Sequence, residues 1–517
     1  MLQILVMLLW AWPGVAEDHY SPGGWSTLHK GPDNRKLVAS APLDGPYRSW
    51  TALAGASVLT APTLSPDGRT LYVTTGKAAG HSNLHAYDLD GALRWRSEPW
   101  RSADRGLDPC AILSSPIVDR EGDVYIGDCN QLFAYHPSGA LKWVVPLPPR
   151  QEGDWEASTT LPINALTTAV FTRTGHVLGI TNFGDVFVVD RGTGRQLNRP
   201  LRLPGRIPPP TALPLSDSMF GGGLIAPEIR EWAWQLLMGG RMRSANTPAV
   251  EVESGRIFVA ATSTSEGKGA LYGLDLVERS PASGGEDGYP VAVVIAFATE
   301  MGPGSGSSPA LSPSGESVYV SDERGLLSAI DARTGAVRWE VPTKAASAAA
   351  AVAGNGDVIA LQSEGSALIA VTREGKVRWQ SDLAELTRAA LPSGWLLGDP
   401  VALGNGNPTV VGDLVLVPVA YGYATELGRH IPWPVRSVLV AVDGATGKGV
   451  RNLVELADDS TGITAVLPDG TILNSLGTAI SSAVSPLAGI ARWLLPDGLE
   501  LLTPVGGLQV SRPERKP

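Results

Sequence analysis

Cysteine is scarce in this chain of 517 residues, which contains only Cys110 and Cys129. Neither lies in a Cys-x-x-Cys spacing, so a zinc-finger type of metal site is not expected. Basic residues are outnumbered as well: 41 Lys and Arg stand against 51 Asp and Glu, a formal net charge of −10. Because no basic stripe is present to neutralise phosphates, nucleic acid is not an expected partner.

Long apolar runs are missing except at the N-terminus. Ile4–Trp12 is apolar, and the small residues of Pro13-Gly-Val-Ala16 follow where a signal peptidase cleaves. We therefore predict a signal peptide at residues 1–16 and a mature protein of residues 17–517, exported to the periplasm or outside the cell, although no Lys or Arg precedes the run. No later stretch is long and apolar enough to predict a transmembrane span. The predicted cleavage point has no cysteine, so a lipid anchor is not expected.

Glycine and proline, in contrast, are abundant, at 60 and 41 residues. They mark the turns of a repeated sequence motif, called the phrase below. Its clearest copy is Ala329-Ile-Asp-Ala-Arg-Thr-Gly-Ala-Val-Arg-Trp339, and related copies end at Trp95, Trp143 and Trp379. An alternating strand enters a turn whose Gly supplies φ > 0, and an Asp before the turn can accept its amides. The closing Trp is a large ring suited to covering the neighbouring unit.

The phrase repeats at roughly 40–50 residues, a period typical of propeller blades. Many short strands with period-two alternation and regular turn signals indicate an all-β fold. The sequence therefore predicts one domain, a single eight-bladed β-propeller of four-stranded antiparallel blades. The blades are predicted to start near residues 57, 112, 165, 247, 308, 347, 407 and 462.

The last predicted blade has no clear closing strand, whereas Gly45–Trp50 near the N-terminus looks like a closing strand without a blade. Pairing the two would close the ring and remove an exposed sheet edge. The alternative is local closure by Leu499–Leu502. A separate feature is the inner strand of blade six, Ala345–Ala353, whose small side chains predict extra room in the central channel.

These repeats resemble the tryptophan-docking repeat of the pyrroloquinoline-quinone (PQQ)-type β-propellers, which include quinoprotein dehydrogenases and the outer-membrane β-barrel assembly lipoprotein. Gly24–Asn34 is similar to the Trp…Gly…Asn opening of such chains, and the resemblance covers roughly residues 24–500. For a dehydrogenase it would imply a quinone over the propeller centre, calcium or a lanthanide on acidic and Asn ligands, and an Asp base. In that family the quinone often lies under a disulfide of adjacent cysteines. This chain has no adjacent cysteine pair and no recognisable set of metal ligands.

Insertions fall mostly on one face of the predicted propeller. The turns between the first and second strands of the blades are tight, and most third-to-fourth-strand turns are too, whereas the other connections are long. Elaborated loops on a regular scaffold usually carry binding, and surface loops without a role are the alternative. The predicted insertions on this face are 96–110, 144–164, 198–246, 380–406 and 419–437, and one near 276–291 lies on the opposite face.

The largest insertion contains a short amphipathic helix at Pro227–Gly239, whose apolar stripe is predicted to pack on the propeller. Trp234 lies off that stripe and is a better candidate for contact with a ligand. Other Trp residues beside charged or imidazole groups can clamp a ligand or simply cover a blade edge, and acidic residues on the same face could bind or stay solvated. The candidate binding residues are Asp108, Asp128, Trp155, Trp234, His430 and Trp433.

Cys110 and Cys129 flank the first two strands of blade two, on the insertion-rich side. In an exported protein we predict that they form a disulfide, and a reactive or metal-binding thiol pair is the alternative. No linear motif of a common hydrolase or nucleotide-binding enzyme is present.

The predicted function is a ligand- or protein-binding scaffold without a cofactor. Two alternatives remain open: a PQQ- and calcium-dependent dehydrogenase of alcohols or sugars, and a hydrolase or lyase whose residues gather from several blades.

Overall fold

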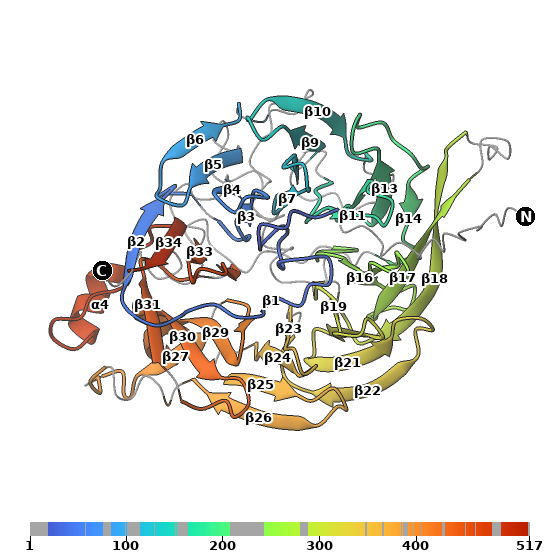
Figure 1. Cartoon of the computed structure of the whole chain (residues 1–517). Helices are drawn as coiled ribbons and strands as arrows, with labels where there is room; N and C mark the ends of the chain where they lie inside the picture. The colour runs from blue at the N-terminus through green and yellow to red at the C-terminus, as the bar shows by residue number, and fades with distance from the viewer. Residues whose placement is uncertain are drawn as a thin grey trace, which may run out of the picture.

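The computed structural model describes residues 19–514. Within that range it leaves out 57, 76–83, 99, 101–113, 129, 150, 152–163, 207–241, 280–287, 305, 347–348, 364–366, 384, 386–390, 395, 405, 427–429, 450, 461 and 478–486. Eight antiparallel sheets surround a central axis like the blades of a propeller (Figure 1). The predicted all-β, eight-bladed fold is therefore confirmed.

The strands of each blade run from the channel outward. Blades one to three contain β3 (Thr63–Leu64), β4 (Thr70–Thr74), β5 (Leu84–Asp88), β6 (Leu93–Arg96); β7 (Ile117–Val118), β8 (Val124–Gly127), β9 (Gln131–Tyr135), β10 (Leu141–Pro146); β11 (Val170–Phe171), β12 (Val177–Ile180), β13 (Asp185–Val189) and β14 (Leu201–Arg202). Blades four to six contain β15 (Ala249–Val250), β16 (Ile257–Thr262), β17 (Gly269–Glu278), β18 (Val291–Met301); β19 (Ala310–Leu311), β20 (Ser317–Ser321), β21 (Leu326–Asp331), β22 (Val337–Pro342); β23 (Ala351–Val352), β24 (Val358–Leu361), β25 (Ala367–Val371) and β26 (Val377–Asp382).

The last two blades are less regular. Blade seven is a six-stranded sheet of β1 (Leu37–Val38), β27 (Val401–Gly404), β28 (Thr409–Val411), β29 (Leu414–Glu426), β30 (His430–Asp443) and β31 (Arg451–Leu456). Blade eight contains β32 (Thr464–Val466), β33 (Ile472–Leu476), β34 (Gly507–Pro513) and β2 (Tyr47–Ala52), and α4 (Ala488–Leu494) lies between β33 and β34.

The ring is closed by the N-terminal strand. β2 pairs antiparallel with β34, from Tyr47 opposite Pro513 to Ala52 opposite Leu508, and so becomes the outer strand of blade eight. This confirms the predicted closure. Leu499–Leu502 does not form a strand, so the alternative of local closure was wrong.

A tryptophan in the outer strand of one blade docks on the glycine turn of the next. The indole N–H of Trp339 donates to Arg373 O at 2.8 Å, and a Cβ on Gly375 would lie only 2.7 Å from the Trp339 ring. β2 supplies blade eight with the same device, because the Trp50 indole N–H donates to Leu89 O at 3.0 Å in blade one. Trp95, Trp143 and Trp379 make equivalent hydrogen bonds.

Every inner hairpin turns on a glycine with positive φ, as the repeat predicts. These φ values range from +56° to +90°. Apolar side chains from facing blades are buried together between the sheets. Tyr125 of blade two, for example, meets Phe171 of blade three edge to face at 5.5 Å.

Residues 19–38, hereafter the N-terminal plug, cross one end of the central channel (Figure 1). The inner edge of each first strand faces the channel, and among the described strands only β28 of blade seven has a strand partner there, since β1 of the plug pairs with it in parallel. The plug accepts one inner-edge amide from each of blades one to seven, and this satisfies donors that would otherwise be buried unpaired. The donating residues are Leu64, Val118, Phe171, Val250, Leu311, Val352 and Val410.

Prolines complement this arrangement. In five blades a proline stands two residues before the donating amide, where a second N–H would point into the channel. Proline has no N–H, so this position leaves no unpaired donor. The five are Pro62, Pro116, Pro248, Pro309 and Pro408.

Two plug side chains donate hydrogen bonds to backbone carbonyls of the blades at the channel edge. The Asn34 amide donates to Thr247 O, Pro248 O and Pro309 O at 2.9–3.1 Å. Lys36 Nζ donates to Ala349 O at 2.6 Å and Ala350 O at 2.9 Å. The small side chains of the blade-six strand therefore lie beside the Lys36 side chain, which occupies channel space at this blade.

Candidate functional site

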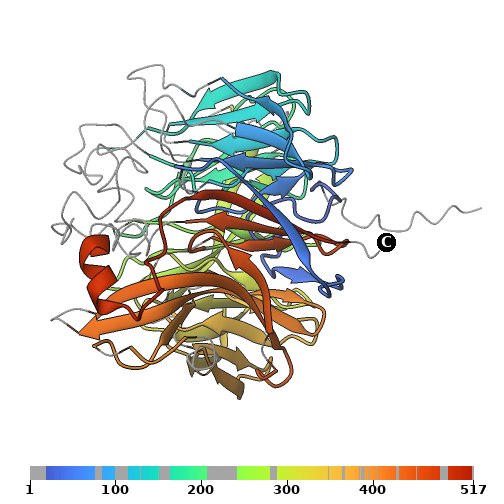
Figure 2. The ribbon, with the colours of Figure 1, turned by 90° about the vertical axis from the view of Figure 1, so that its left-hand side faces the viewer.

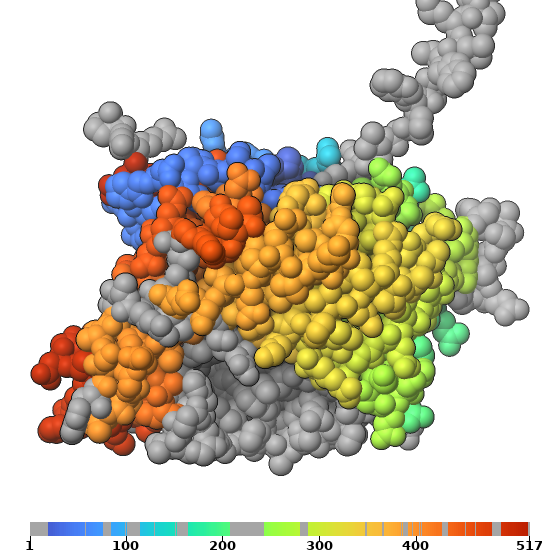
Figure 3. All heavy atoms as spheres, turned by 90° about the horizontal axis from the view of Figure 1, so that it is seen from below, coloured from blue at the N-terminus to red at the C-terminus, as the bar shows by residue number. Residues whose placement is uncertain are grey.

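The two faces of the propeller differ. The plug lies at the end of the first strands, just before the tight inner turns such as the one on Gly68, and closes the channel there. On the opposite face, α4 and the extended ends of β29 and β30 project beyond the blades (Figures 2 and 3). We call this second face the loop face. It is the end at which the plug does not close the channel.

The projecting elements form a small apolar core of their own. Tyr423 of β29 lies opposite Trp433 of β30, and both pack with Ala491 of α4. The Trp433 indole N–H donates to Thr425 Oγ1 at 3.0 Å, and the Tyr423 hydroxyl donates to Pro392 O at 2.6 Å. The packing of Ala491 against Tyr423 and Trp433 holds α4 on the hairpin.

The outer side of α4 is apolar but exposed. Ile490 and Trp493 lie three residues apart and therefore on one side of the helix, with 56% and 74% of their surfaces exposed. The Arg492 guanidinium lies 5.5 Å from the Trp493 ring centroid. An exposed Trp beside an Ile and an Arg has the composition of an interface anchor.

A buried polar network lies at the loop face in blade three. Both carboxylate oxygens of Asp185 lie 3.0 Å from Arg202 Nη1, and Asn164 Nδ2 is 3.1 Å from one of them. Burial raises the pKa of Asp185 to about 6, because desolvation outweighs the hydrogen bonds to the carboxylate.

Arg243 extends this network to the base of the largest insertion. Its Nε donates to Gly205 O and its Nη1 to Phe183 O, both at 2.7 Å. Gly205 and Arg243 stand at the two ends of the segment 206–242, so the guanidinium ties its start to its end. The network therefore anchors an insertion of the loop face.

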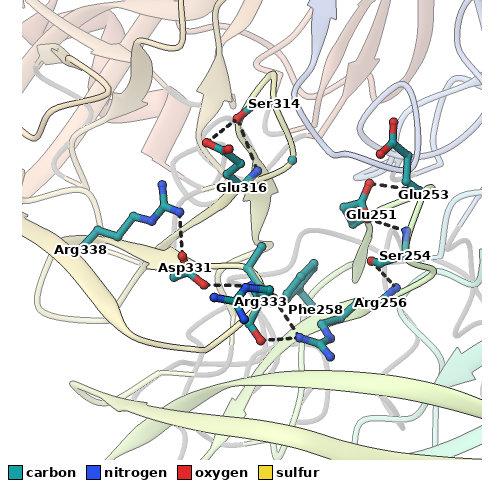
Figure 4. Close-up of a pocket in the computed structure, with 12 residues that line it drawn as sticks. Glu251, Glu253, Ser254, Arg256, Phe258, Ser314, Glu316, Asp331, Arg333 and Arg338 are labelled. Atoms are coloured by element: carbon teal, nitrogen blue, oxygen red, sulfur yellow. Dashed lines mark hydrogen bonds and ion pairs between the residues drawn. The ribbon is translucent and has the colours of Figure 1, made fainter.

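Grooves are also present on the opposite, tight-turn face. One of about 420 Å³ lies between blades four and five (Figure 4). Several of its charged groups have local partners: Arg338 pairs with Asp331 at 2.7 Å, and Glu251 accepts the Ser254 amide at 2.7 Å. Similar grooves of about 550 and 360 Å³ lie between blades three and four and between blades five and six. Their recurrence at successive blade boundaries indicates a feature of the repeat.

Several predicted site residues lie outside the described residues: Asp108, Cys110, Cys129, Trp155 and Trp234. His430 begins β30 opposite Glu426. Trp433 is only 3% exposed, in the core beneath α4. Asp128 is buried, and its Oδ1 accepts the amides of Asn130 and Gln131 at 2.7 Å. Their roles in binding stay predictions, and the structure additionally gives Trp433 a packing role and Asp128 a turn-stabilising one.

Sequence reasoning missed Ile490 and Trp493. The available signal was Ala488-Gly-Ile-Ala-Arg-Trp-Leu494, in which apolar residues follow a helical spacing. It also missed the plug, where the sequence pattern indicates only the family-like opening Gly24–Asn34.

Three buried carboxylates at the loop face have partners of their own and do not come together as a calcium site. Asp128 and Asp322 each accept two turn amides, Asp185 pairs with Arg202, and the three lie in different blades. Across the part of the chain that the structure describes, no three or more His, Cys, Asp or Glu side chains cluster as a metal site. In the same residues, no helix is both long and apolar enough to cross a bilayer.

Eight blades of mainly antiparallel strands, with a tryptophan docked on the next blade at five of the described boundaries, define a PQQ-type β-propeller. A family model described as outer membrane protein assembly factor BamB matches residues 13–212 and 296–466, and the chain belongs to this family. No curated protein matches the chain significantly by sequence.

Solved structures share the fold at low identity. A europium-containing methanol dehydrogenase is 15% identical, with a TM-score of 0.56 over 95% of this chain and 98% of its own. Quinohemoprotein alcohol dehydrogenase ADHIIG from Pseudomonas putida HK5 is 14% identical, with a TM-score of 0.52 over 96% of this chain and 82% of its own. BamB from Moraxella catarrhalis is 13% identical, with a TM-score of 0.47 over 90% and 98% of the two chains. The likeness to the two dehydrogenases shows the fold alone.

Proposed function

We propose that this protein is an exported scaffold that binds another protein through its loop face. The observation that carries the proposal is the exposed pair Ile490 and Trp493 on α4, held outward by the packing of α4 on β29 and β30. Large aromatic side chains with most of their surface in water are the usual anchors of protein interfaces. The family description, an outer membrane protein assembly factor, is in keeping with protein binding.

The predicted insertions add to this face. Asp108, Trp155, Trp234 and His430 are proposed to contribute contacts on the loop face, as are Trp433 and Asp128 through the elements that they stabilise. Export is supported by the apolar N-terminus and by the family described above. In an oxidising compartment Cys110 and Cys129 would form the proposed disulfide, which non-reducing peptide mapping of the protein from its own host would detect.

The binding proposal is tested by changing the anchor. Replacing both Ile490 and Trp493 with Ala should remove a polypeptide that co-purifies in stoichiometric amount with the wild type, while the melting temperature stays unchanged. The matched control replaces Leu93 and Val377, which are half-exposed on outer strands, and should retain the partner. Equal retention by both double variants would contradict the proposal.

The dehydrogenase alternative has a separate test. The purified chain is mixed with PQQ and calcium, and dye-linked oxidation is followed on a panel of alcohols and sugars. The binding proposal predicts no saturable, quinone-dependent turnover. Such turnover would favour a dehydrogenase function for this chain over the binding function.

A further inference from the structure

Lys36 is a charged residue sealed inside the channel. Its side chain is 0% exposed, and Nζ donates to the carbonyls of Ala349 and Ala350. An ammonium carries three N–H donors, so these two bonds leave one unused. No carboxylate of the described residues pairs with Lys36, and burial lowers the pKa of Lys36 to about 7.

His29 belongs to the same plug, and its ring lies within range of an electrostatic interaction with the Lys36 ammonium. It is 2% exposed, and within the described part of the chain neither ring nitrogen has a hydrogen-bond partner. Burial, and secondly the charge of Lys36, holds the pKa of His29 well below its usual value. The Thr27 hydroxyl, also buried in the plug, has no partner among the described residues.

The position of Lys36 is fixed by its backbone as well as by its hydrogen bonds. Its φ is +53°, a left-handed conformation that lysine seldom adopts, and Asn34 two residues earlier has a φ of +57°. Strained residues of this kind persist only where their surroundings hold them, and they cluster at ligand sites. The backbone conformation of the plug and the two hydrogen bonds of Nζ therefore hold the Lys36 side chain in the channel.

We propose that the plug binds a small monovalent anion, of the halide class, between the Lys36 ammonium and the His29 ring. The anion would accept the third N–H of Lys36 and a ring N–H of His29. Water could satisfy these hydrogen bonds, but it would leave the ammonium without a counter-charge, whereas a bound anion keeps Lys36 charged at neutral pH. A divalent anion fits less well, because burial lowers both pKa values, so that the two side chains carry at most one positive charge, and the carbonyls of Ala349 and Ala350 repel negative charge.

The direct test is crystallographic. The full chain is refolded and crystallised in bromide, and anomalous scattering is measured at the bromine edge. A peak in contact with Lys36 Nζ and the His29 ring is expected. Bromide peaks on the surface with none at this position would overturn the proposal and assign the site to water.

A second test uses stability in solution. A ligand that binds only the folded state raises the melting temperature with its concentration. Raising chloride through a hundredfold range above its dissociation constant should raise the wild-type melting temperature by about 3 °C, and formate at equal ionic strength shows whether a carboxylate can replace the halide. Lys36→Met should lose this rise, whereas Lys30→Met, a change at a partly exposed plug lysine that also has positive φ (82°), should keep it. An equal rise in both variants would contradict the proposal.

Discussion

Gly447 and Gly449 share a φ of +68° but differ in their surroundings. A Cβ on Gly447 would lie 2.6 Å from the buried Trp379 ring, whereas a Cβ on Gly449 would meet nothing within 4 Å. Gly449→Ala should therefore cost only the left-handed backbone strain, about 1 kcal/mol. Gly447→Ala should cost about 1–3 kcal/mol more, because the tryptophan must move. Urea unfolding of the two variants measures the difference. Equal losses of unfolding free energy would contradict a stabilising role for the docking of Trp379 on the next blade.

Asp331 illustrates the role of the turn carboxylate. Its Oδ1 accepts the Thr334 amide at 2.7 Å and the Thr334 hydroxyl at 2.8 Å, and Arg338 donates to Oδ2 at 2.7 Å. Arg338 first, and Thr334 after it, hold the pKa of Asp331 well below its usual value. The carboxylate therefore stabilises the fold fully above its unfolded pKa of about 4, and this stabilisation is lost as pH falls toward the folded pKa.

Asp331→Asn should accordingly lower the free energy of unfolding at pH 7 by about 1–3 kcal/mol. The difference from the wild type should shrink as pH falls below about 4. Denaturant unfolding at several pH values measures it. Glu253→Gln, a change of another turn carboxylate on the same face, is the control and should have little effect; a difference for Asp331→Asn that grows in acid would contradict this account.

The roles of these residues could be predicted from the sequence because each repeats. The Asp, the Gly and the Trp of the phrase act within one turn or between neighbouring blades, so their spacing reveals them. The burial of Trp433 could not be predicted in this way, because its neighbours Tyr423 and Ala491 come from other elements and no repeat aligns them.

At the scale of elements, β2 and the plug make separable contributions that nested N-terminal truncations can resolve. A chain starting at His19 keeps both, one starting at Asp44 loses the plug, and one starting at Leu53 also loses β2. Removing the plug should lower the melting temperature, because blades one to seven lose acceptors for channel-facing amides. Removing β2 should lower it sharply further and promote self-association, since β34 becomes an open edge.

Circular dichroism melts and light scattering of the three truncations provide the measurement. Equal melting temperatures for the chains starting at His19 and Leu53 would contradict the closure of the ring by β2.

Amide exchange should report the plug directly. In the full chain the inner-strand amides of Leu64, Val118 and Val352 donate to plug carbonyls and should exchange slowly. In the chain starting at Asp44 they should exchange much faster, while amides of the second strands, such as Tyr72 and Ile359, stay protected. Unchanged protection at the three inner positions would mean that the plug does not hold these amides.

The sequence could predict β2 because a closing strand without a blade and a blade without a closing strand are both visible. The plug gave no comparable signal. Most of its contacts are made by backbone amides and carbonyls of seven blades, which leave no side-chain pattern in the sequence. Only the prolines that stand two residues before the donating amides mark the channel edge. α4 escaped prediction because seven residues are too short for helical periodicity to stand out.

The whole molecule is asymmetric from face to face. The plug closes the channel beside the tight turns, and α4 with the β29–β30 hairpin builds outward from the other end. A partner is therefore expected at the loop face. The grooves of the tight-turn face, such as that between Glu251 and Arg338, are occupied by their own ion pairs and hydrogen bonds.

Site-specific photocrosslinking in the native host tests this claim most directly. A photoreactive amino acid is placed at Trp493 on the loop face and, in a separate strain, at Leu93, an exposed apolar position on an outer strand. The account predicts a discrete adduct with another polypeptide from position 493 and none from position 93. An adduct from position 93 with none from position 493 would contradict it.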